Sequence, residues 1–240
     1  MHTMIVRPAG AGPFLLALIN HASTESAEQR ALLPEPSYAA LTTWFVKRGY
    51  LVALPQRPGH GPTGGPYLEA QGGCDDADYV RAGRGGAASI EAALTAMFAR
   101  ADVRKTGALV VGHSAGGWGA LALASRNPRG VAAIIDFAGG RGGRSFDHAN
   151  NNCAPERLIE AARVFGATAR IPTLWIYAEN DSYFAPPLVR RMADAWRDGG
   201  GRVDLAVVPA FGLEGHRLAE ADDGAAVWAP IVAGFLARLK

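Results

Sequence analysis

The stretch from Gly107 to Arg126 constrains the fold more than any other part of the sequence. It reads GALVVGHSAGGWGALALASR: aliphatic residues lead into a glycine-rich turn, and small helix-favouring residues follow it. This order predicts a buried strand that passes through a sharp turn directly into a helix. Gly112 and Gly116 flank the turn, where a Cβ atom would collide with backbone that doubles back on itself.

Ser114 stands at the centre of the turn, in the pattern G-x-S-x-G. Between a strand and a helix, this pattern is typical of a nucleophile elbow, in which a strained turn lifts the serine hydroxyl above the sheet edge. The alternative is a glycine-rich turn that binds a phosphate or merely packs closely. A dinucleotide fingerprint is excluded because Trp118 stands where its third glycine belongs, and no Gly-Lys-Ser/Thr follows for a P-loop. We interpret Ser114 as a nucleophile.

Short apolar runs alternate with amphipathic stretches along all 240 residues. We expect one α/β domain over residues 1–240, with a mostly parallel sheet covered by helices on both faces. The expected strands are 3–7, 14–20, 50–54, 108–111, 131–136, 173–177 and 203–208. The expected helices are 37–48, 79–100, 118–125, 155–165, 187–198 and 225–239. Long loops are expected at 21–36, 55–78 and 138–154.

Charge and hydropathy narrow the functional classes. The 24 Lys and Arg residues against 22 Asp and Glu residues give a net charge of +2, without the basic stripe that nucleic-acid binding needs. The longest apolar runs are too short to span a bilayer, so no membrane partner is expected. The first residues lack the apolar segment and cleavage site of a signal peptide. No metal or cofactor motif occurs, so neither a metal nor a cofactor is expected.

Cys74 and Cys153 both lie in polar stretches, GGCDDAD and NNNCAPE. Two interpretations stay open: two free thiols in a cytoplasmic enzyme, or one disulfide that ties two loops together in a periplasmic or secreted one. Neither cysteine has C-x-x-C spacing, which argues against zinc or redox chemistry.

A serine hydroxyl needs a base to take its proton, and the base needs an acid to orient it. In an open parallel sheet these groups follow the carboxyl ends of the strands. His216 meets this condition in the loop after the last expected strand, and Asp181 in the turn after strand 173–177. The order serine, acid, histidine is the order of the elbow fold.

The acid has two other candidates. Asp136 ends the strand next along the chain from the nucleophile strand, but it leads straight into a glycine-rich loop. Glu179 comes earlier in the same turn as Asp181. Among the other histidines, His21 and His60 follow strands and could line a pocket, whereas a structural or surface role is the default for a lone histidine.

The tetrahedral intermediate of acyl transfer needs two preorganised N–H donors. The backbone of Ala115, directly after the nucleophile, is one candidate. The second is expected in the loop after strand 14–20, at Ser23 or at Ala22. The alternative for this loop is an ordinary strand-exit turn.

The chain resembles the α/β-hydrolase superfamily over nearly its whole length, and within it the serine hydrolases grouped as dienelactone hydrolase-like. The matching stretches are INHAS, FVKRGYLVALPQRPGHG, VVGHSAGGWGALALASRNP, FAGGRGG, PTLWIYAENDSYF and FGLEGH. The resemblance implies a triad of Ser114, Asp181 and His216 that acts on carboxylic esters by an acyl-enzyme route. Two positions depart from it: dienelactone hydrolases carry Cys where this chain has Ser114, and relatives commonly have Gly where it has Ala22.

We therefore expect a serine hydrolase with a small-molecule ester substrate and no cofactor. The loops 55–78 and 138–154 would roof its pocket, with His21, Tyr67, Tyr183 and Phe184 as candidate walls. An acyltransferase or a small peptidase would use the same triad. A non-catalytic scaffold is the alternative from a different class, and the three filled triad positions argue against it.

Overall fold

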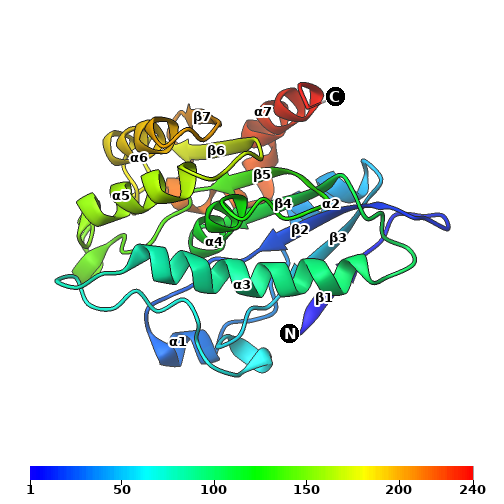
Figure 1. Cartoon of the computed structure of the whole chain (residues 1–240), viewed down its shortest axis with the longest axis horizontal. Coiled ribbons are helices and arrows are strands. Elements are labelled where there is room, and N and C mark those ends of the chain that lie inside the picture. The colour runs from blue at the N-terminus through cyan, green and yellow to red at the C-terminus, as the bar shows by residue number, and fades with distance from the viewer. Residues whose placement is uncertain (240) are drawn as a thin grey trace.

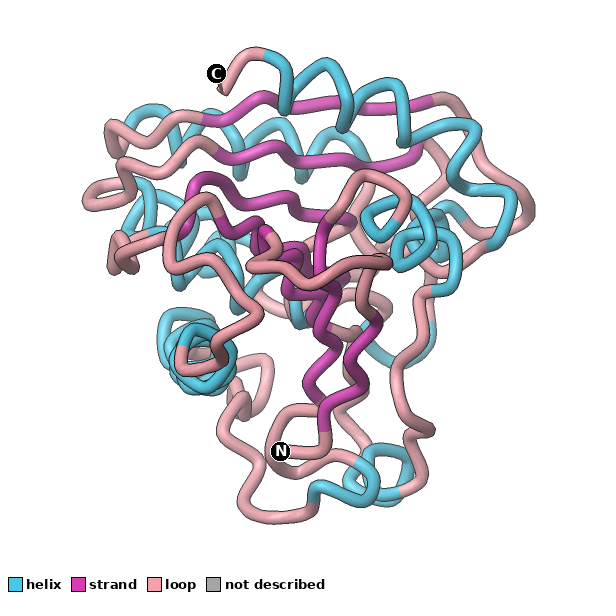
Figure 2. Tube along the Cα trace, turned by 90° about the vertical axis from the view of Figure 1, so that its right-hand side faces the viewer, coloured by secondary structure: helices cyan, strands magenta, loops and turns pink. Residues whose placement is uncertain are grey.

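Seven strands form one sheet in the computed structural model, which describes residues 1–239 (Figure 1). The strands are β1 (Thr3–Val6), β2 (Leu15–Asn20), β3 (Tyr50–Pro55), β4 (Ala108–His113), β5 (Val131–Phe137), β6 (Thr173–Ala178) and β7 (Val203–Val208). Their order across the sheet is β1-β3-β2-β4-β5-β6-β7, and every neighbouring pair is parallel except β1 with β3. The sheet is twisted: in Figure 2 the strands at its two ends run in clearly different directions.

Helices cover both faces of the sheet. They are α1 (Ala27–Ala31), α2 (Ala39–Val46), α3 (Tyr79–Phe98), α4 (Ala115–Ala124), α5 (Pro155–Gly166), α6 (Pro186–Asp198) and α7 (Ala225–Ala237), with short 3₁₀ helices η1 (Gly61–Thr63), η2 (Ser145–Asp147), η3 (Gly215–Ala219) and η4 (Asp222–Gly224). Helices α3, α4, α5 and α6 pack on one face, and α2 and α7 on the other. The central strand β4 is therefore buried on both sides.

The side chains of β4 show why the central strands are mostly apolar. Val110 packs into the cluster under α3 and α4, whereas Leu109 and Val111 pack into the cluster under α2 and α7. A parallel strand that is covered on both faces has no solvent-facing position to fill with a polar residue. Trp118 and Trp228, one on each side of the sheet, are fully buried.

The predicted α/β architecture is confirmed, with each expected strand and helix at its predicted place. The prediction of a plain loop over residues 21–36 is wrong, because α1 lies inside it. Ser26 caps this helix by accepting a hydrogen bond from the backbone N–H of Gln29 at 3.2 Å. Helix α1 is only five residues long, too short to show the apolar periodicity that reveals a helix in a sequence.

A disulfide joins Cys74 to Cys153, as one of the two interpretations of the sequence predicted, with the Cα atoms 5.0 Å apart. It ties the loop before α3 to the loop between β5 and α5. Cys153 is buried, its N–H donates to Gly142 at 2.8 Å, and its carbonyl accepts a hydrogen bond from Tyr79. The loop between β5 and α5 is thus fastened to the start of α3, just before α5 begins.

Replacing both cysteines by alanine is expected to lower the free energy of unfolding by about 4 kcal/mol, because the bridge spans 79 residues and restricts the unfolded chain. Urea unfolding of the wild type and of the double variant, each with and without reductant, measures the loss. Reductant should destabilise the wild type only. Two free thiols in protein prepared under oxidising conditions would contradict the bridge.

Candidate active site

Ser114 lies at the junction of β4 and α4, with backbone angles φ 54° and ψ −119°. A non-glycine residue with positive φ is strained, and such strain persists only where the surroundings impose it. Here the neighbours impose it by close approach. A Cβ at Gly112 would overlap the backbone of Gly116, and a Cβ at Gly116 would overlap the carbonyl of Asn20. Both glycines are therefore needed for the turn.

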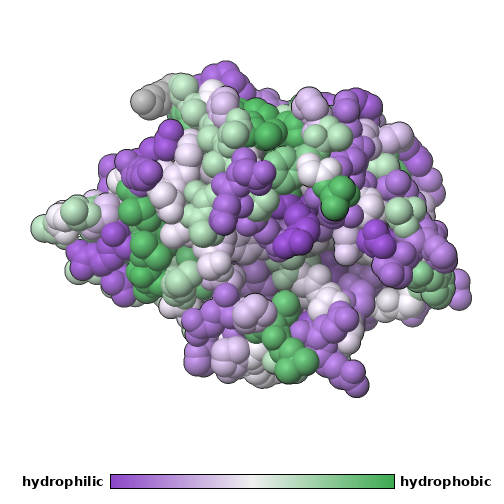
Figure 3. All heavy atoms as spheres, turned by 180° about the vertical axis from the view of Figure 1, so that it is seen from behind, coloured by the Kyte–Doolittle hydropathy of each residue, from purple (hydrophilic) through white to green (hydrophobic). Residues whose placement is uncertain are grey.

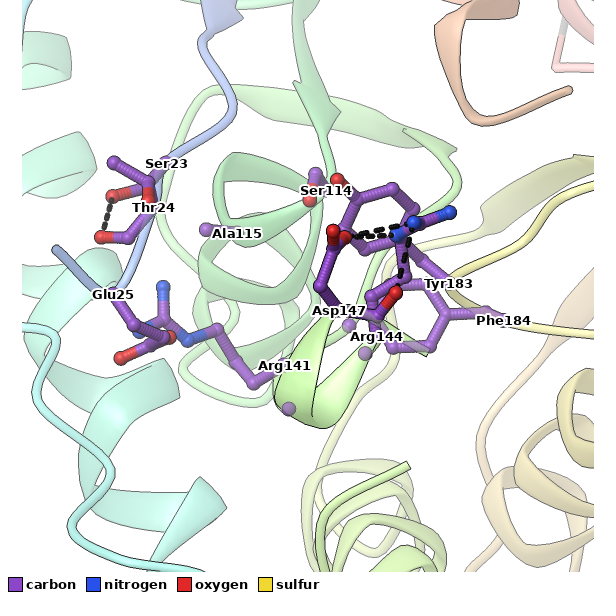
Figure 4. Close-up of a pocket in the computed structure, with 13 residues that line it drawn as sticks. Ser23, Thr24, Glu25, Ser114, Ala115, Arg141, Arg144, Asp147, Tyr183 and Phe184 are labelled. Atoms are coloured by element: carbon purple, nitrogen blue, oxygen red, sulfur yellow. Dashed lines mark hydrogen bonds and ion pairs between the residues drawn. The ribbon is translucent and has the colours of Figure 1, made fainter. Parts of the chain in front are cut away.

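A pocket of about 250 Å³ opens beside Ser114, and we call it the serine pocket (Figure 4). Its lining comes from residues 23–25, 114–115, 140–144, 147 and 183–184. The carboxyl ends of β2, β4, β5 and β6 lead into these segments, so the pocket lies where an open parallel sheet places its ligands. Of the pocket residues expected from the sequence, Tyr183 and Phe184 line it.

Asp181 and His216 are brought together from the loops after β6 and β7. The Nδ1 atom of His216 lies 3.1 Å and 3.2 Å from the two carboxylate oxygens of Asp181. Asp181 is 1% exposed, and its Oδ1 also accepts the backbone N–H groups of Tyr183 and Phe184 at 2.8 Å and 3.0 Å. A carboxylate can only accept here, so Nδ1 of His216 carries the proton and Nε2 has a free lone pair.

Tyr183 covers the imidazole of His216. The two rings stack with their centroids 4.1 Å apart and their planes 24° from parallel. Figure 4 shows the Tyr183 side chain pointing toward Ser114. No hydrogen bond joins Ser114 to His216 within residues 1–239; in enzymes without substrate such bonds are often long and tighten on binding.

Asp136, the rival candidate for the acid, lies at the end of β5 and is fully buried. Its Oδ2 is 3.1 Å from the Tyr177 hydroxyl, and its Oδ1 has no hydrogen-bond partner among the described residues. Burial raises the pKa of Asp136 to about 8, although hydrogen bonds from Tyr177 and from the backbone of Gly139 oppose the rise. The carboxyl is thus neutral at pH 7, and it forms no hydrogen bond to His216 in the described chain.

The raised pKa of Asp136 predicts a pH-dependent stability. Between the ordinary aspartate pKa of about 4 and the folded value of about 8, the folded protein keeps a proton that the unfolded chain releases. Stability should therefore fall by about 1.4 kcal/mol for each pH unit in this window, from this group alone. Asp136→Asn removes the effect, so between pH 5 and pH 8 the variant should gain at most about 4 kcal/mol on the wild type.

Urea unfolding of both proteins at pH 5, 6.5 and 8 tests this. Parallel pH profiles for the wild type and Asp136→Asn would show that Asp136 does not hold a proton in the folded protein.

Ala115 and Ser23 both line the serine pocket (Figure 4). Ala115 begins α4, where backbone N–H groups have no partner within the helix. Residues 21–26 follow β2, and we call them the β2 loop. In this loop, the N–H of Ala22 donates to the Tyr38 hydroxyl at 3.0 Å and so is not available to a substrate. Of the two positions predicted in this loop, only Ser23 has an N–H without a hydrogen-bond partner among the described residues, and it lines the serine pocket.

Two histidines hold the β2 loop in place. Nε2 of His21 accepts the N–H of Arg57 at 3.1 Å, and Nε2 of His60 lies 2.7 Å from the Ser23 hydroxyl. Burial, with the nearby charge of Arg57, lowers the pKa of both histidines, that of His21 well below its ordinary value. Both rings are therefore neutral, and the Ser23 hydroxyl donates to His60. His21 lies outside the serine pocket and lines a neighbouring one.

A buried ionic cluster includes Arg141, which lines the serine pocket. Arg57, fully buried, contacts both carboxylate oxygens of Glu69, at 2.5 Å and 3.2 Å. Burial alone would raise the pKa of Glu69, but Arg57 and Arg141 lower it below its ordinary value. Arg141 also donates to Glu25 at 2.6 Å and to Tyr67 at 2.7 Å. Tyr67 was predicted to line the pocket, but it does not; its hydroxyl instead contacts Arg141, which does.

A second arginine, Arg144, also lines the serine pocket. Arg144 donates to the hydroxyl of Ser182 at 2.8 Å, and Ser182 in turn contacts Glu214 at 2.5 Å. Glu214 also accepts the backbone N–H of His216 at 3.0 Å. The loop closed by the disulfide is therefore connected through polar contacts to the segment that carries His216.

His113, next to Ser114 in the turn, connects three loops. Its Nε2 lies 2.8 Å from the carbonyl oxygen of His216, so Nε2 carries the proton. Its Nδ1 lies 3.0 Å from the hydroxyl of Tyr38, and the same hydroxyl accepts the N–H of Ala22 at 3.0 Å. A chain of three hydrogen bonds thus runs from the β2 loop through Tyr38 and His113 to the backbone of His216.

Tyr38→Phe should disturb this chain. It leaves the N–H of Ala22 without its partner, which costs about 1 to 3 kcal/mol for a buried donor. We expect stability to fall by about that amount and kcat by about tenfold, because both loops beside Ser114 lose their common support. Tyr50→Phe is the matched control, since the Tyr50 hydroxyl has no hydrogen bond within residues 1–239. Equal kinetics in the two variants would contradict the role of Tyr38.

Four residues of the site were not predicted from the sequence: Arg141, Arg144, Glu25 and Tyr38. The two arginines had a detectable signal: they follow a buried parallel strand directly, in the stretch FAGGRGGR, at the edge where ligands bind. Glu25 and Tyr38 had none, because their contacts depend on the path of a loop.

Within residues 1–239, no group of three or more His, Cys, Asp and Glu side chains is arranged to bind a metal ion. In the same part of the chain, no helix has the length and apolar character that a bilayer crossing requires.

Comparison with solved structures gives similarity across nearly the whole chain. A Klebsiella pneumoniae protein assigned as a dienelactone hydrolase aligns with a TM-score of 0.63 and 17% identity, covering 98% of this chain and 92% of its own. Esterase PE8 aligns at 0.64 and 17% identity, covering 99% and 98%. An acylaminoacyl peptidase from Pyrococcus horikoshii aligns at 0.68 and 12% identity, covering 98% of this chain and 39% of its own. No protein-family model and no curated protein matches the sequence.

These structural neighbours are hydrolases, and they share the α/β-hydrolase fold. The chain therefore has the α/β-hydrolase fold, as its motifs predicted. Because the sequence identities are low, the comparison establishes the fold alone. The function is inferred from the residues of the site.

Proposed function

We propose that the protein is a serine hydrolase that cleaves carboxylic esters through an acyl-enzyme intermediate. The observation that carries the proposal is the arrangement of Ser114 in a strained turn beside a pocket, with Asp181 oriented on His216 in the neighbouring loops. Backbone strain of this kind is concentrated at functional sites, and a serine needs a nearby base to act as a nucleophile.

In the first half of the reaction, the Ser114 hydroxyl attacks the ester carbonyl and Nε2 of His216 takes its proton. Asp181 keeps the proton on Nδ1 and stabilises the imidazolium that forms. The N–H groups of Ala115 and Ser23 donate to the oxyanion, where charge develops in the transition state. His216 then gives its proton to the leaving alcohol, and the acyl group stays on Ser114.

In the second half, water enters and His216 takes a proton from it as it attacks the acyl carbonyl. The proton returns to the Ser114 oxygen when the carboxylic acid leaves. Substrate binding must bring Ser114 and His216 into hydrogen-bond contact, with a rearrangement of Tyr183 over the imidazole. An acyltransferase or a peptidase would use the same first half and differ in what takes up or leaves the acyl group.

A panel of p-nitrophenyl esters of increasing acyl length tests the proposal. We expect turnover of short acyl esters, because the serine pocket holds only about 250 Å³ and has charged walls. Product analysis by mass spectrometry, with an added alcohol or amine as competing acceptor, separates hydrolysis from acyl transfer. A folded protein that releases no p-nitrophenol from any ester would contradict the proposal.

A further inference from the structure

A second pocket of about 300 Å³ lies on the other side of the β2 loop, and we call it the proline pocket. Its walls come from residues 21–24 and 33–38, and Glu220 closes one side. Ser23 and Thr24 line both pockets. Figure 3 shows the rear face of the molecule hollowed between its upper and lower parts, with hydrophobic and hydrophilic side chains around the hollow.

The proline pocket is apolar and acidic. Leu33, Pro34, Pro36 and Tyr38 give it apolar walls. The charged residues that line it are two carboxylates, Glu35 and Glu220, and no Lys or Arg belongs to its lining among the described residues. The serine pocket differs, because it contains two arginines, each paired with a carboxylate.

Two contacts bear on the charge of Glu220. Outside the pocket, Nε of Arg217 lies 3.6 Å from Glu220, and Nδ1 of His113 lies 3.5 Å from it. Burial alone would raise the pKa of Glu220, but these neighbours lower it, so the carboxylate is ionised. His21, the third titratable group of the lining apart from Tyr38, is neutral because its pKa is lowered. The lining therefore holds two carboxylates and no Lys or Arg, while Arg217 and His113 contact Glu220 from outside it.

The position of the proline pocket relates it to one part of the reaction. Glu220 directly follows η3, the short helix that carries His216, and Ser23 lies at the proposed oxyanion site. His216 is the group that gives its proton to the leaving alcohol. A substrate over Ser114 with its acyl part in the serine pocket would extend its alcohol part past Ser23 toward His216 and Glu220.

We propose that the proline pocket binds the alcohol part of the ester and favours an apolar alcohol that carries a cationic group. The proposal rests on the proposed ester hydrolysis. Apolar walls would take the hydrocarbon body, and the carboxylates of Glu35 and Glu220 would attract the cation, as opposite charges near a protein surface do.

An isosteric pair of acetate esters tests the charge preference. Acetylcholine and 3,3-dimethylbutyl acetate have the same acyl group and the same shape, and they differ by a quaternary nitrogen in place of a carbon. We expect kcat/KM to be about two- to fivefold higher for the choline ester, the range of a partly exposed ion pair. Glu35→Gln should reduce this ratio toward one. Glu28→Gln, an exposed change on α1 outside the pocket, should leave it unchanged.

A second pair of variants tests the apolar wall. Leu33 lines the pocket, whereas its neighbour Leu32 is 82% exposed and does not. Leu33→Gln should lower kcat/KM for both large esters by about tenfold and leave methyl acetate nearly unchanged, because methanol does not reach the wall. Leu32→Gln should change none of the three.

The outcomes separate the two proposals. If methyl acetate is hydrolysed and Leu33→Gln behaves like Leu32→Gln, the alcohol does not bind in the proline pocket, and ester hydrolysis stands. A choline preference of one or less, or one that Glu35→Gln does not reduce, overturns the charge preference. If no acetate ester is hydrolysed by folded protein, ester hydrolysis itself fails, and this inference fails with it.

Discussion

Ser114→Ala is expected to reduce kcat for ester hydrolysis by about 10⁵- to 10⁶-fold, because loss of the nucleophile leaves only binding and oxyanion stabilisation to catalyse the reaction. Stability should change little. Ser114 is 8% exposed, and its hydroxyl has no hydrogen-bond partner within residues 1–239. Removing one oxygen atom therefore breaks no contact that holds the turn.

Ester hydrolysis by the wild type and the variant, with thermal unfolding of both, measures these effects. Ser125→Ala is the matched control at the opposite end of α4, where the hydroxyl donates only to the carbonyl of Ala122. It should keep wild-type turnover. A Ser114→Ala protein with a wild-type rate would show that the reaction does not use this serine.

Asp181→Asn is expected to reduce kcat by about 10⁴-fold. The amide can still accept the backbone N–H groups of Tyr183 and Phe184, so the turn should stay intact. It cannot stabilise a positive imidazolium, and its NH₂ group opposes the N–H of His216. The imidazole is then free to adopt the wrong tautomer for taking a proton from Ser114.

Asp136→Asn is the matched comparison, since it makes the same change at the other candidate acid. Because Asp136 already holds a proton at pH 7, its amide should reduce kcat by less than about tenfold at that pH. Activity and unfolding of both variants at pH 7 decide between them. If Asp136→Asn proves the more damaging in a folded protein, the triad must be redrawn with Asp136.

The sequence was sufficient for the architecture because its signals are local and strong. Each central strand is mostly apolar, with its few polar residues near its ends, and Gly112 and Gly116 mark a turn that few other residues permit. The disulfide was predicted as one of two alternatives, because the pattern names the cysteines but not the distance between their loops. Helix α1 was missed because five residues show no period.

The candidate site was less visible in the sequence where it depends on packing. Ser114, Asp181 and His216 each follow a strand, so the topology alone places them at one edge of the sheet. The buried pair of Arg57 and Glu69 has no such signal, because both lie in a loop without periodicity. Their pairing depends on how that loop folds over the sheet.

The most direct test of the account is the site at which a serine-reactive phosphonate attaches. Such a reagent forms a covalent bond only with an activated hydroxyl, so it reports the nucleophile independently of the substrate. We expect one adduct per chain, located by peptide mass mapping on Ser114, absent in Ser114→Ala and formed much more slowly in Asp181→Asn. A folded protein that takes up no phosphonate, or takes it up on another serine, would contradict the assignment of Ser114 as the nucleophile.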